Sequence, residues 1–403
     1  MRMKLKRTEK NQVHMMILPE YGKQKLLTYA DSFRDLADVF TKINTDNMEV
    51  QTVKDSNDRS AFLYKRKVHE SREIMADHLN EMAHVMTEVA QISFAYASLP
   101  ERTCRQVCHF LKSEGILVKE IHYIENEDKR MEIGATLALD KGSTKTTKEV
   151  ADLMSVIFDK RLCVSKETDY YLDTRYRDFH FLEEPAYFAF MGTAKAVKEN
   201  ESVSGDNFCQ FETERGGMTV MLSDGMGSGE KACADSHRVL DLMERFLSAG
   251  FSGDTAVRMV NTSLSMGGGE NNMSTLDVCN IDLHKGVVEL TKVGAASTFI
   301  KRANLVEQIS SRNLPLGVFG KLEPEVTRRK IMDGDYIIMV SDGILDGLSQ
   351  GIGEEVLPEI ISHINLENPK EMAAYILNYV IRTCKGVIRD DMTVIVVGVW
   401  ENA

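Results

Sequence analysis

Acidic residues stand at the ends of apolar runs throughout the C-terminal half of the chain. Two of these runs, 218–223 and 336–341, each end in Ser-Asp-Gly, which gives Asp224-Gly225 and Asp342-Gly343. Further carboxylates stand at Asp206, Asp390 and Asp391. Short apolar runs that stop at turn residues are typical of buried strands. We therefore expect four groups of carboxylates to lie at strand ends.

Carboxylates at strand ends suggest a particular chemistry. One Asp-Gly pair after a strand is explained by a turn alone, because both residues favour turns. Several carboxylates that converge would repel one another unless a cation neutralised them. Carboxylates, backbone carbonyls and water are the ligands that Mg²⁺ and Mn²⁺ prefer. Two such ions about 3.5–4 Å apart can activate a shared water for attack on phosphorus, so no protein nucleophile is needed.

The elements that position these residues begin near residue 186. The pattern predicts strands followed by turn signals, including the turns at 215–217 and 284–286. The predicted strands are 186–198, 205–212, 217–223, 273–283, 286–294, 297–301, 325–331, 334–341 and 392–400, and the predicted helices are 229–248, 254–265, 353–363 and 369–384. Consecutive hairpins favour antiparallel sheets that the helices must cover. We predict an α+β fold, a four-layer αββα sandwich of two antiparallel sheets, over residues 186–403.

Residues 1–185 are expected to form an N-terminal regulatory region. A long helix is predicted over 62–96, and its seam of Met75, Leu79, Met82, Met86 and Val89 alternates spacings of four and three. Either a dimer-forming coiled coil or an amphipathic helix packed on its own domain explains that seam. An α-β-β-α-β pattern follows, with a hairpin over 116–139 and an extended segment near 179–184. This small α/β module shows no convergent polar cluster, so we interpret it as regulatory.

Composition excludes several classes of protein. A chain of 403 residues with 43% hydrophobic residues is long enough for two folded domains. A net charge of −12 argues against nucleic-acid binding. No apolar run approaches the length of a membrane span, and the basic N-terminus lacks the apolar core of a signal peptide. Seven cysteines without a CxxC pair predict a reduced, cytoplasmic protein without disulfides, and Cys104, Cys108 and His109 lack the further ligands of a zinc site.

The order of the motifs resembles a known family. The motifs are Ser204-Gly205-Asp206-Asn207, 222–229 around Asp224, Ser274-Thr275-Leu276-Asp277, Leu314-Pro315-Leu316-Gly317, Val340-Ser341-Asp342-Gly343 and 389–393. Together they resemble the metal-dependent (PPM, type 2C) serine/threonine protein phosphatases, and more narrowly their bacterial stage II sporulation protein E branch. The resemblance covers about residues 186–403, and residues 62–185 resemble the regulatory segment of that branch more loosely. The membrane-spanning N-terminal region of that branch has no counterpart in this chain.

The resemblance implies roles for individual residues. Asp224 is expected to bridge two Mn²⁺ or Mg²⁺ ions, and the Gly225 carbonyl to bind the second ion. Asp342 and Asp390 would complete the shell of the first ion, and Asp206 would bind the second directly or through water. Asp390 is preferred to Asp391, which would then be a turn or supporting residue. The implied substrate is a phosphorylated anti-sigma-factor antagonist of the STAS type, and we expect a homodimer.

Other features carry weaker hypotheses. The glycines at 225, 227 and 229 precede a helix, where they either hold an anion or form a tight turn. Residues 266–270 are either a flap or a linker, and His237 is either a proton donor or an ordinary helix residue. Asp346 is interpreted as a helix-start residue, and no phosphate-binding arginine is apparent. Two other functions remain open: a catalytically silent binding or dimerising module, and a histidine-kinase-type ATPase, which would leave Asp342 and Asp390 unexplained.

Overall fold

The structure, a computed structural model, divides into two compact units. The first contains Met1–Val50 and Met75–Glu184, and the second contains Gln51–Ile74 and Pro185–Ala403. The structure describes residues 26–38, 72–73, 75–87, 90, 99, 101–125, 130–140, 144–165, 168–213, 216–249, 251–266, 273–311, 313–317, 322, 324–349 and 353–402. The regulatory and catalytic roles assigned to the two parts of the chain stay predictions.

Two helical segments of the first unit, 26–38 and 75–87, pack against each other through small side chains. Phe33 and Ala37 contact Ala76 and Leu79, and the Arg34 guanidinium donates a hydrogen bond of 2.9 Å to the Thr87 hydroxyl. Alanines that are at most 2% exposed recur every seven residues, at 30 and 37 and at 76, 83 and 90. Small side chains let two helix backbones approach closely, so alanine takes the buried positions.

This packing corrects the predicted methionine seam. Met75 is 41% exposed and its neighbour Ala76 is 2% exposed, so the buried stripe lies one position further along the helix. Leu79 is buried as predicted. The sequence analysis predicted that the largest apolar side chains form the contact, whereas alanines occupy most of its buried positions. Val89 and residues 62–71 and 91–96, which belong to the predicted long helix, lie outside the described residues.

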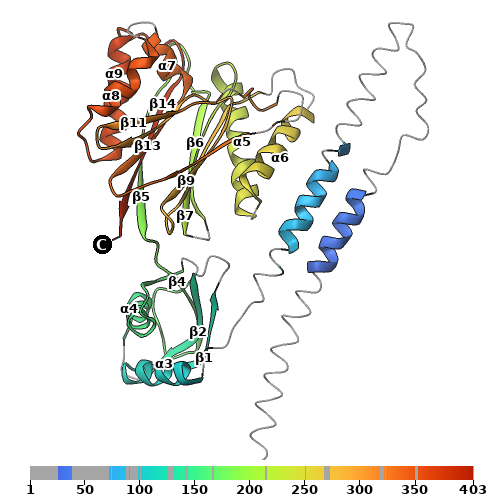
Figure 1. Ribbon diagram of the computed structural model, residues 1–403, viewed down its shortest axis with the longest axis vertical. Coiled ribbons are helices and arrows are strands. Elements are labelled where there is room, and N and C mark those ends of the chain that lie inside the picture. Colours follow the sequence, from blue (N-terminus) through green and yellow to red (C-terminus); the bar gives the residue numbers. More distant parts are fainter. Residues whose placement is uncertain are drawn as a thin grey trace, which may run out of the picture. The chain divides into compact units, whose positions relative to one another are not determined.

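A small α/β module completes the described part of the first unit. Its elements are α3 (Glu101–Ser113), β1 (Ile116–Glu125), β2 (Met131–Leu139), α4 (Thr147–Phe158), β3 (Leu162–Val164) and β4 (Arg177–Glu183), as Figure 1 shows. The strands form one antiparallel sheet in the order β1-β2-β4-β3. The Thr146 hydroxyl and the Glu149 side chain cap the start of α4 reciprocally. The predicted order of elements is confirmed, and only the three-residue strand β3 was missed.

Two five-stranded antiparallel sheets form the second unit. One has the order β11-β10-β13-β14-β5 and the other β12-β9-β8-β7-β6. Their strands are β5 (Tyr187–Ala196), β6 (Asp206–Thr213), β7 (Gly217–Asp224), β8 (Leu276–Asp282), β9 (Val287–Val293), β10 (Thr298–Arg302), β11 (Leu305–Ile309), β12 (Glu325–Lys330), β13 (Asp335–Val340) and β14 (Met392–Glu401). Two helices, α5 (Gly229–Ser248) and α6 (Gly253–Met266), cover the second sheet. The first is covered by α7 (Asp342–Ser349), α8 (Leu357–Ser362) after the short 3₁₀ turn η1 (Glu354–Val356), and α9 (Pro369–Thr383).

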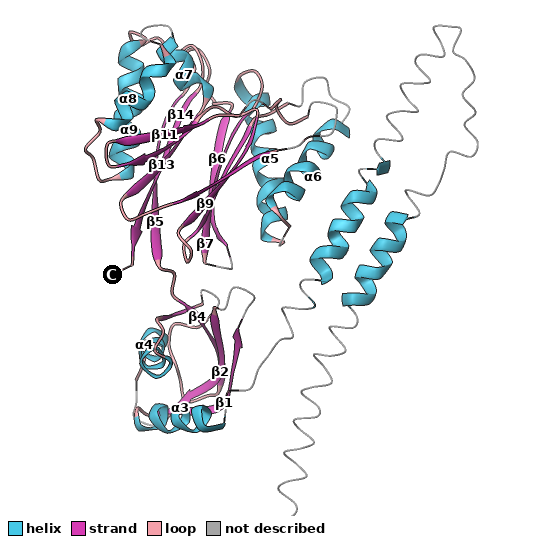
Figure 2. Ribbon diagram, viewed as in Figure 1, coloured by secondary structure: helices cyan, strands magenta, loops and turns pink. Residues whose placement is uncertain are grey.

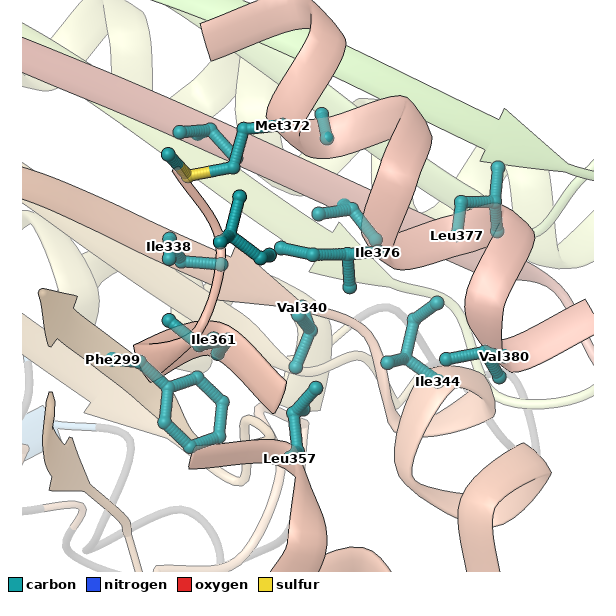
Figure 3. Close-up of a cluster of buried hydrophobic side chains, with 14 of the residues drawn as sticks. Phe299, Ile338, Val340, Ile344, Leu357, Ile361, Met372, Ile376, Leu377 and Val380 are labelled. Atoms are coloured by element: carbon teal, nitrogen blue, oxygen red, sulfur yellow. The ribbon is translucent and has the colours of Figure 1, made fainter. Parts of the chain in front are cut away.

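Figure 2 shows the helices and sheets of this unit as four layers, and three hydrophobic layers lie between them. The middle layer lies between the sheets and includes Val220, Ile337 and Val397. One outer layer packs α5 and α6 against β7 and β8, and the other packs Ile344, Ile361 and Ile376 of α7–α9 under the first sheet, as Figure 3 shows. Strands β7 and β13 are therefore covered on both faces, which explains their continuous apolar runs. The predicted αββα sandwich is confirmed.

Two elements of this unit were not predicted. Strand β11 follows β10 after the turn at Ala303, whose φ of 51° is positive. Helix α7 begins at Asp342 itself, without an intervening loop, so Asp346 lies one turn inside the helix rather than at its start. Among the residues that the structure describes, no helix is long and apolar enough to cross a bilayer.

Candidate metal centre

Neighbouring strands bring the four predicted aspartates to one end of the sandwich. Asp206 is the first residue of β6 and pairs directly with Asp224, the last residue of the antiparallel strand β7. In the other sheet, β13 leads into Asp342, and Asp390 stands just before β14, the antiparallel neighbour of β13. The Ser341 N–H donates a hydrogen bond of 3.0 Å to the Thr393 carbonyl. This bond fixes the end of β13 to the start of β14 and so keeps Asp342 near Asp390.

Asp206 is the most deeply buried of the four, at 1% exposed. The Thr393 hydroxyl donates a hydrogen bond of 2.6 Å to Asp206 Oδ2, whereas Asp206 Oδ1 has no hydrogen-bond partner. Burial raises the pKa of Asp206 to about 6, although the hydrogen bond from Thr393 acts in the opposite direction. A buried acceptor without a donor is costly and indicates a missing partner.

Asp224 has the most perturbed carboxyl. Burial, and then the charges of Asp206, Asp342 and Asp390, raise its pKa to about 9. Its backbone is held by the next strand, because the Asp224 N–H donates to Thr275 Oγ1 at 3.0 Å and the Thr275 N–H donates to the Asp224 carbonyl at 2.8 Å. The Ser274 hydroxyl donates to the same carbonyl at 2.7 Å. The backbone of Asp224 is thus fixed by contacts that do not involve its carboxyl group.

The glycines after Asp224 and Asp342 allow close backbone packing. A Cβ on Gly225 would lie 2.1 Å from the Ala232 carbonyl oxygen, and one on Gly343 would lie 2.1 Å from the Asp391 carbonyl oxygen. Each of these glycines therefore lies where no larger residue fits. Burial, and then the charges of Asp390 and Asp346, also raise the pKa of Asp342. The repulsion among these carboxylates is the condition that a bound cation would relieve.

Asp390 and Asp391 have different surroundings. Both carboxylate oxygens of Asp391 accept backbone hydrogen bonds, from the Lys198 N–H at 3.0 Å and from the Gly205 N–H at 2.7 Å. The Asp391 residue is 3% exposed. The Asp390 side chain is 42% exposed, and its Oδ1 lies 3.9 Å from the Lys198 ammonium nitrogen. This geometry favours Asp390 as a ligand and gives Asp391 a role in holding the Gly205 and Lys198 segments together.

This contrast gives a prediction about the two neighbours. Asp391→Asn replaces one acceptor oxygen with an amide group that faces a backbone N–H, so we expect a loss of about 1–3 kcal/mol in the free energy of unfolding. Asp390→Asn is expected to change that free energy by no more than about 0.5 kcal/mol and to weaken Mn²⁺ binding. Chemical denaturation and Mn²⁺ titration of both variants measure the difference. Equal destabilisation by the two substitutions would contradict the assignment.

The donor set fits a hard divalent cation. It combines four carboxylates from four strand ends, an unpartnered buried oxygen on Asp206, and the backbone of Gly225 drawn close to Gly205 by an N–H···O bond of 3.3 Å. Within the described ranges, no three His, Cys, Asp or Glu side chains form a metal-ligand cluster by themselves. Backbone carbonyl and water ligands, which Mg²⁺ usually retains, would accompany the carboxylates.

Other predicted residues lie as follows. His237 is an exposed residue of α5. The glycines at 227 and 229 have positive φ values of 105° and 76°, as a tight turn requires. The carboxylate of Glu201 lies at the start of α5, where it accepts a hydrogen bond of 2.9 Å from the Ser228 hydroxyl. That position disfavours an anion site there. Residues 267–270 of the predicted flap lie outside the described residues.

Sequence reasoning missed several residues around the four aspartates. Thr393, Ser274 and Thr275 hydrogen-bond to the candidate ligands Asp206 and Asp224, and Lys198 places its ammonium group near Asp390. Thr393, Ser274 and Thr275 could have been found from the sequence, since all three stand in the motifs quoted above. The contact of Lys198 with Asp390 joins residues far apart in the chain, and no local spacing reveals it.

The chain matches two family descriptions of known proteins. The family description "Stage II sporulation protein E (SpoIIE)" matches residues 214–400, and "SpoIIE, regulatory domain" matches residues 34–182. The chain is similar to the solved PP2C phosphatase domain with a fragment of the regulatory domain of SpoIIE from Bacillus subtilis. That likeness has a TM-score of 0.63 and 28% identity, and it covers 88% of this chain and 100% of the other. The second unit therefore has the fold of a PP2C-type phosphatase domain.

Curated relatives give the family. The chain is 30% identical over 340 residues to stage II sporulation protein E of Priestia megaterium, and 29% identical over 339 residues to that of Bacillus subtilis. Each match covers 84% of this chain, which spans 58% and 41% of those relatives. The chain belongs to the stage II sporulation protein E family. The family match over 214–400 includes Asp224, Asp342 and Asp390, and it begins after Asp206.

Proposed function

We propose that this protein is a metal-dependent protein serine/threonine phosphatase with two Mn²⁺ or Mg²⁺ ions. The observation that carries the proposal is the set of carboxylates at four strand ends, where burial and mutual repulsion raise the pKa values of Asp206 and Asp224 to about 6 and about 9. Family membership and the PP2C-type fold support the same reaction class. A binding module without catalytic function would have no need to maintain this repulsion.

The residues of the chain have distinct tasks in this proposal. Asp224 would bridge the ions, Asp342 and Asp390 would hold the first, and Asp206 with the Gly225 carbonyl would hold the second. Such ions lower the pKa of a bound water and neutralise phosphoryl oxygens. Ser274 and Thr275 fix the backbone of Asp224, and Thr393 orients the carboxylate of Asp206. These contacts preorganise the ligands before a substrate phosphate binds.

The proposed substrate is a phosphoserine or phosphothreonine on a STAS-type anti-sigma-factor antagonist, so that the reaction controls release of a sigma factor. The names of the relatives place them in sporulation. The test is phosphate release from the phosphorylated STAS protein of the same cell, with Mn²⁺ and with a chelator. Metal-dependent release supports the proposal. Mn²⁺ binding without release would favour the catalytically silent module, and ATP binding by calorimetry would favour the ATPase.

The first unit is proposed to regulate this site, within a homodimer. The match of residues 34–182 to the SpoIIE regulatory domain supports the regulatory role. Light scattering and phosphatase assays of the whole chain, compared with a chain lacking residues 1–185, test both parts of this proposal. An unchanged activity together with an unchanged association state would remove it.

A further inference from the structure

A buried ion pair lies beside the candidate metal centre, and the proposed function assigns it no role. Asp277 of β8 pairs across the sheet with Lys292 of β9, and both residues are 1% exposed. Asp277 Oδ2 accepts hydrogen bonds from Lys292 Nζ and from Thr298 Oγ1, the latter at 2.6 Å. Lys292 Nζ also donates to Thr298 Oγ1 at 2.8 Å. Because Thr298 begins β10 of the other sheet, the three side chains connect the two sheets.

This arrangement is costly for a purely structural contact. Removing two charges from water costs several kcal/mol per ion, and the attraction offsets this only where the remaining lone pairs are also satisfied. Asp277 does not meet that condition. Oδ2 takes both partners, while the buried Oδ1 has no hydrogen-bond partner. A contact needed only for packing would be met by apolar side chains, as in the layer between the sheets.

Asp277, whose Oδ1 has no hydrogen-bond partner, lies at the wall of a small cavity. Asp277 lines the same small cavity as Asp224, Thr275 and Asp342, and the other walls come from residues 294–296 and 340–341. The cavity is thus bounded by two of the proposed metal ligands. A cavity with carboxylates and a serine on its walls offers the several polar partners that an ordered water requires.

We propose that Asp277 is a positioning residue of the metal centre, whose Oδ1 accepts a hydrogen bond from a water ligand of the cation held by Asp224 and Asp342. Lys292 and Thr298 both bond to Oδ2, which leaves Oδ1 as the oxygen available to such a water. This inference rests on the proposed function, since it requires a cation at the centre. Replacing a residue that hydrogen-bonds to a metal ligand typically changes the metal affinity about 10- to 100-fold.

The competing explanation is that Asp277 only neutralises Lys292. The two explanations differ for a variant that removes both charges. If Asp277 acts on the water ligand, Asp277→Asn and the double variant Asp277→Asn with Lys292→Met both bind Mn²⁺ about 10- to 100-fold more weakly than the wild type. If Asp277 only balances the charge of Lys292, the double variant recovers the affinity of the wild type.

The experiment is calorimetric titration of Mn²⁺ into the full chain and its variants. The matched control is Asp335→Asn, because Asp335 is also fully buried and paired with a cation, Arg302, at 2.7 Å. It stands at the start of β13, at the other end of that strand from Asp342. We expect this control to lose stability and keep its Mn²⁺ affinity.

The outcomes separate this inference from the proposed function. A double variant that binds Mn²⁺ within about twofold of the wild type overturns the role of Asp277. If Asp277→Asn alone fails to fold because Lys292 is left unpaired, the double variant decides, since replacing both members of a buried pair is often neutral for stability. A wild-type chain that binds no Mn²⁺ would defeat the proposed function itself, whatever the variants do.

Discussion

Asp224→Asn is expected to abolish Mn²⁺-dependent phosphate release while the fold survives. Removing one preorganised electrostatic group from an active site costs about 100- to 1,000-fold in rate. Asp224 is proposed to serve both ions, so we expect a loss of at least that size. Steady-state phosphate release from a phosphorylated STAS substrate measures the rate, and Mn²⁺ titration measures the loss of binding.

The fold is expected to survive because of how Asp224 is held. The hydrogen bonds that fix this residue to Ser274 and Thr275 use its backbone, and asparagine leaves them intact. The carboxyl itself is destabilising when no cation is bound, since burial and three neighbouring carboxylates raise its pKa. Circular dichroism of the variant at neutral pH should therefore show the spectrum of the wild type.

Asp346→Asn is the matched control for this substitution. Asp346 is also acidic, lies in α7 one turn after Asp342, and is exposed. We expect it to keep activity within a few-fold of the wild type, because its charge acts on Asp342 only as one contribution among several. Full activity in Asp224→Asn would remove the metal assignment, whereas an equal loss in both variants would indicate a general effect of negative charge.

The sequence identified the candidate ligands but not the residues that support them, for a physical reason. Asp224 and Asp342 follow apolar runs and Asp206 stands at the start of a strand, so these strand ends are visible in the local sequence pattern. Whether those ends meet depends on strand order, and here the resemblance supplied what periodicity alone could not. The different surroundings of Asp390 and Asp391 are seen only in the folded structure, where the Gly205 and Lys198 N–H groups donate to the Asp391 carboxylate.

Long-range contacts explain the other differences. The Asp277–Lys292–Thr298 cluster joins three strands and two sheets, so no spacing along the chain predicts it. The helix contact in the first unit was misplaced because alanine carries little hydrophobic signal, although small size decides how closely helices pack. The order and type of most elements were predictable from the sequence, but the partners of a buried charge were not.

The final expectation concerns pH. Without metal, Asp224 has a pKa of about 9 in the folded state and of about 3.8 in an ordinary environment. Between these values the folded chain holds a proton that the unfolded chain has lost, so the free energy of unfolding falls as pH rises. One such group contributes at most about 1.4 kcal/mol per pH unit. Asp206, with a pKa of about 6, adds to this slope only below that pH.

Asp224→Asn isolates this effect, because other titrating groups contribute nearly equally to both proteins. Without metal, the thermal midpoint of the variant should rise above that of the wild type, and the difference should grow from pH 5 to pH 8. A change of 1 kcal/mol corresponds to about 2–4 °C in a domain of 150–250 residues. Excess Mn²⁺ should reverse the order near pH 5, where the difference between the two proteins is smallest. A ligand at 100 times its dissociation constant stabilises the folded state by about 2.7 kcal/mol, and cation binding requires the deprotonated carboxylates.

Differential scanning calorimetry across this pH range, with a chelator and then with Mn²⁺, measures both effects. A wild-type chain that gains stability relative to Asp224→Asn between pH 5 and pH 8 in the chelator would show that burial and the neighbouring carboxylates do not raise the pKa of Asp224. Mn²⁺ stabilisation that is equal in the two proteins would show that the ion binds elsewhere. The expected reversal requires both conditions, a destabilising cluster of carboxylates and a cation that occupies it, because neither condition alone changes which protein is the more stable.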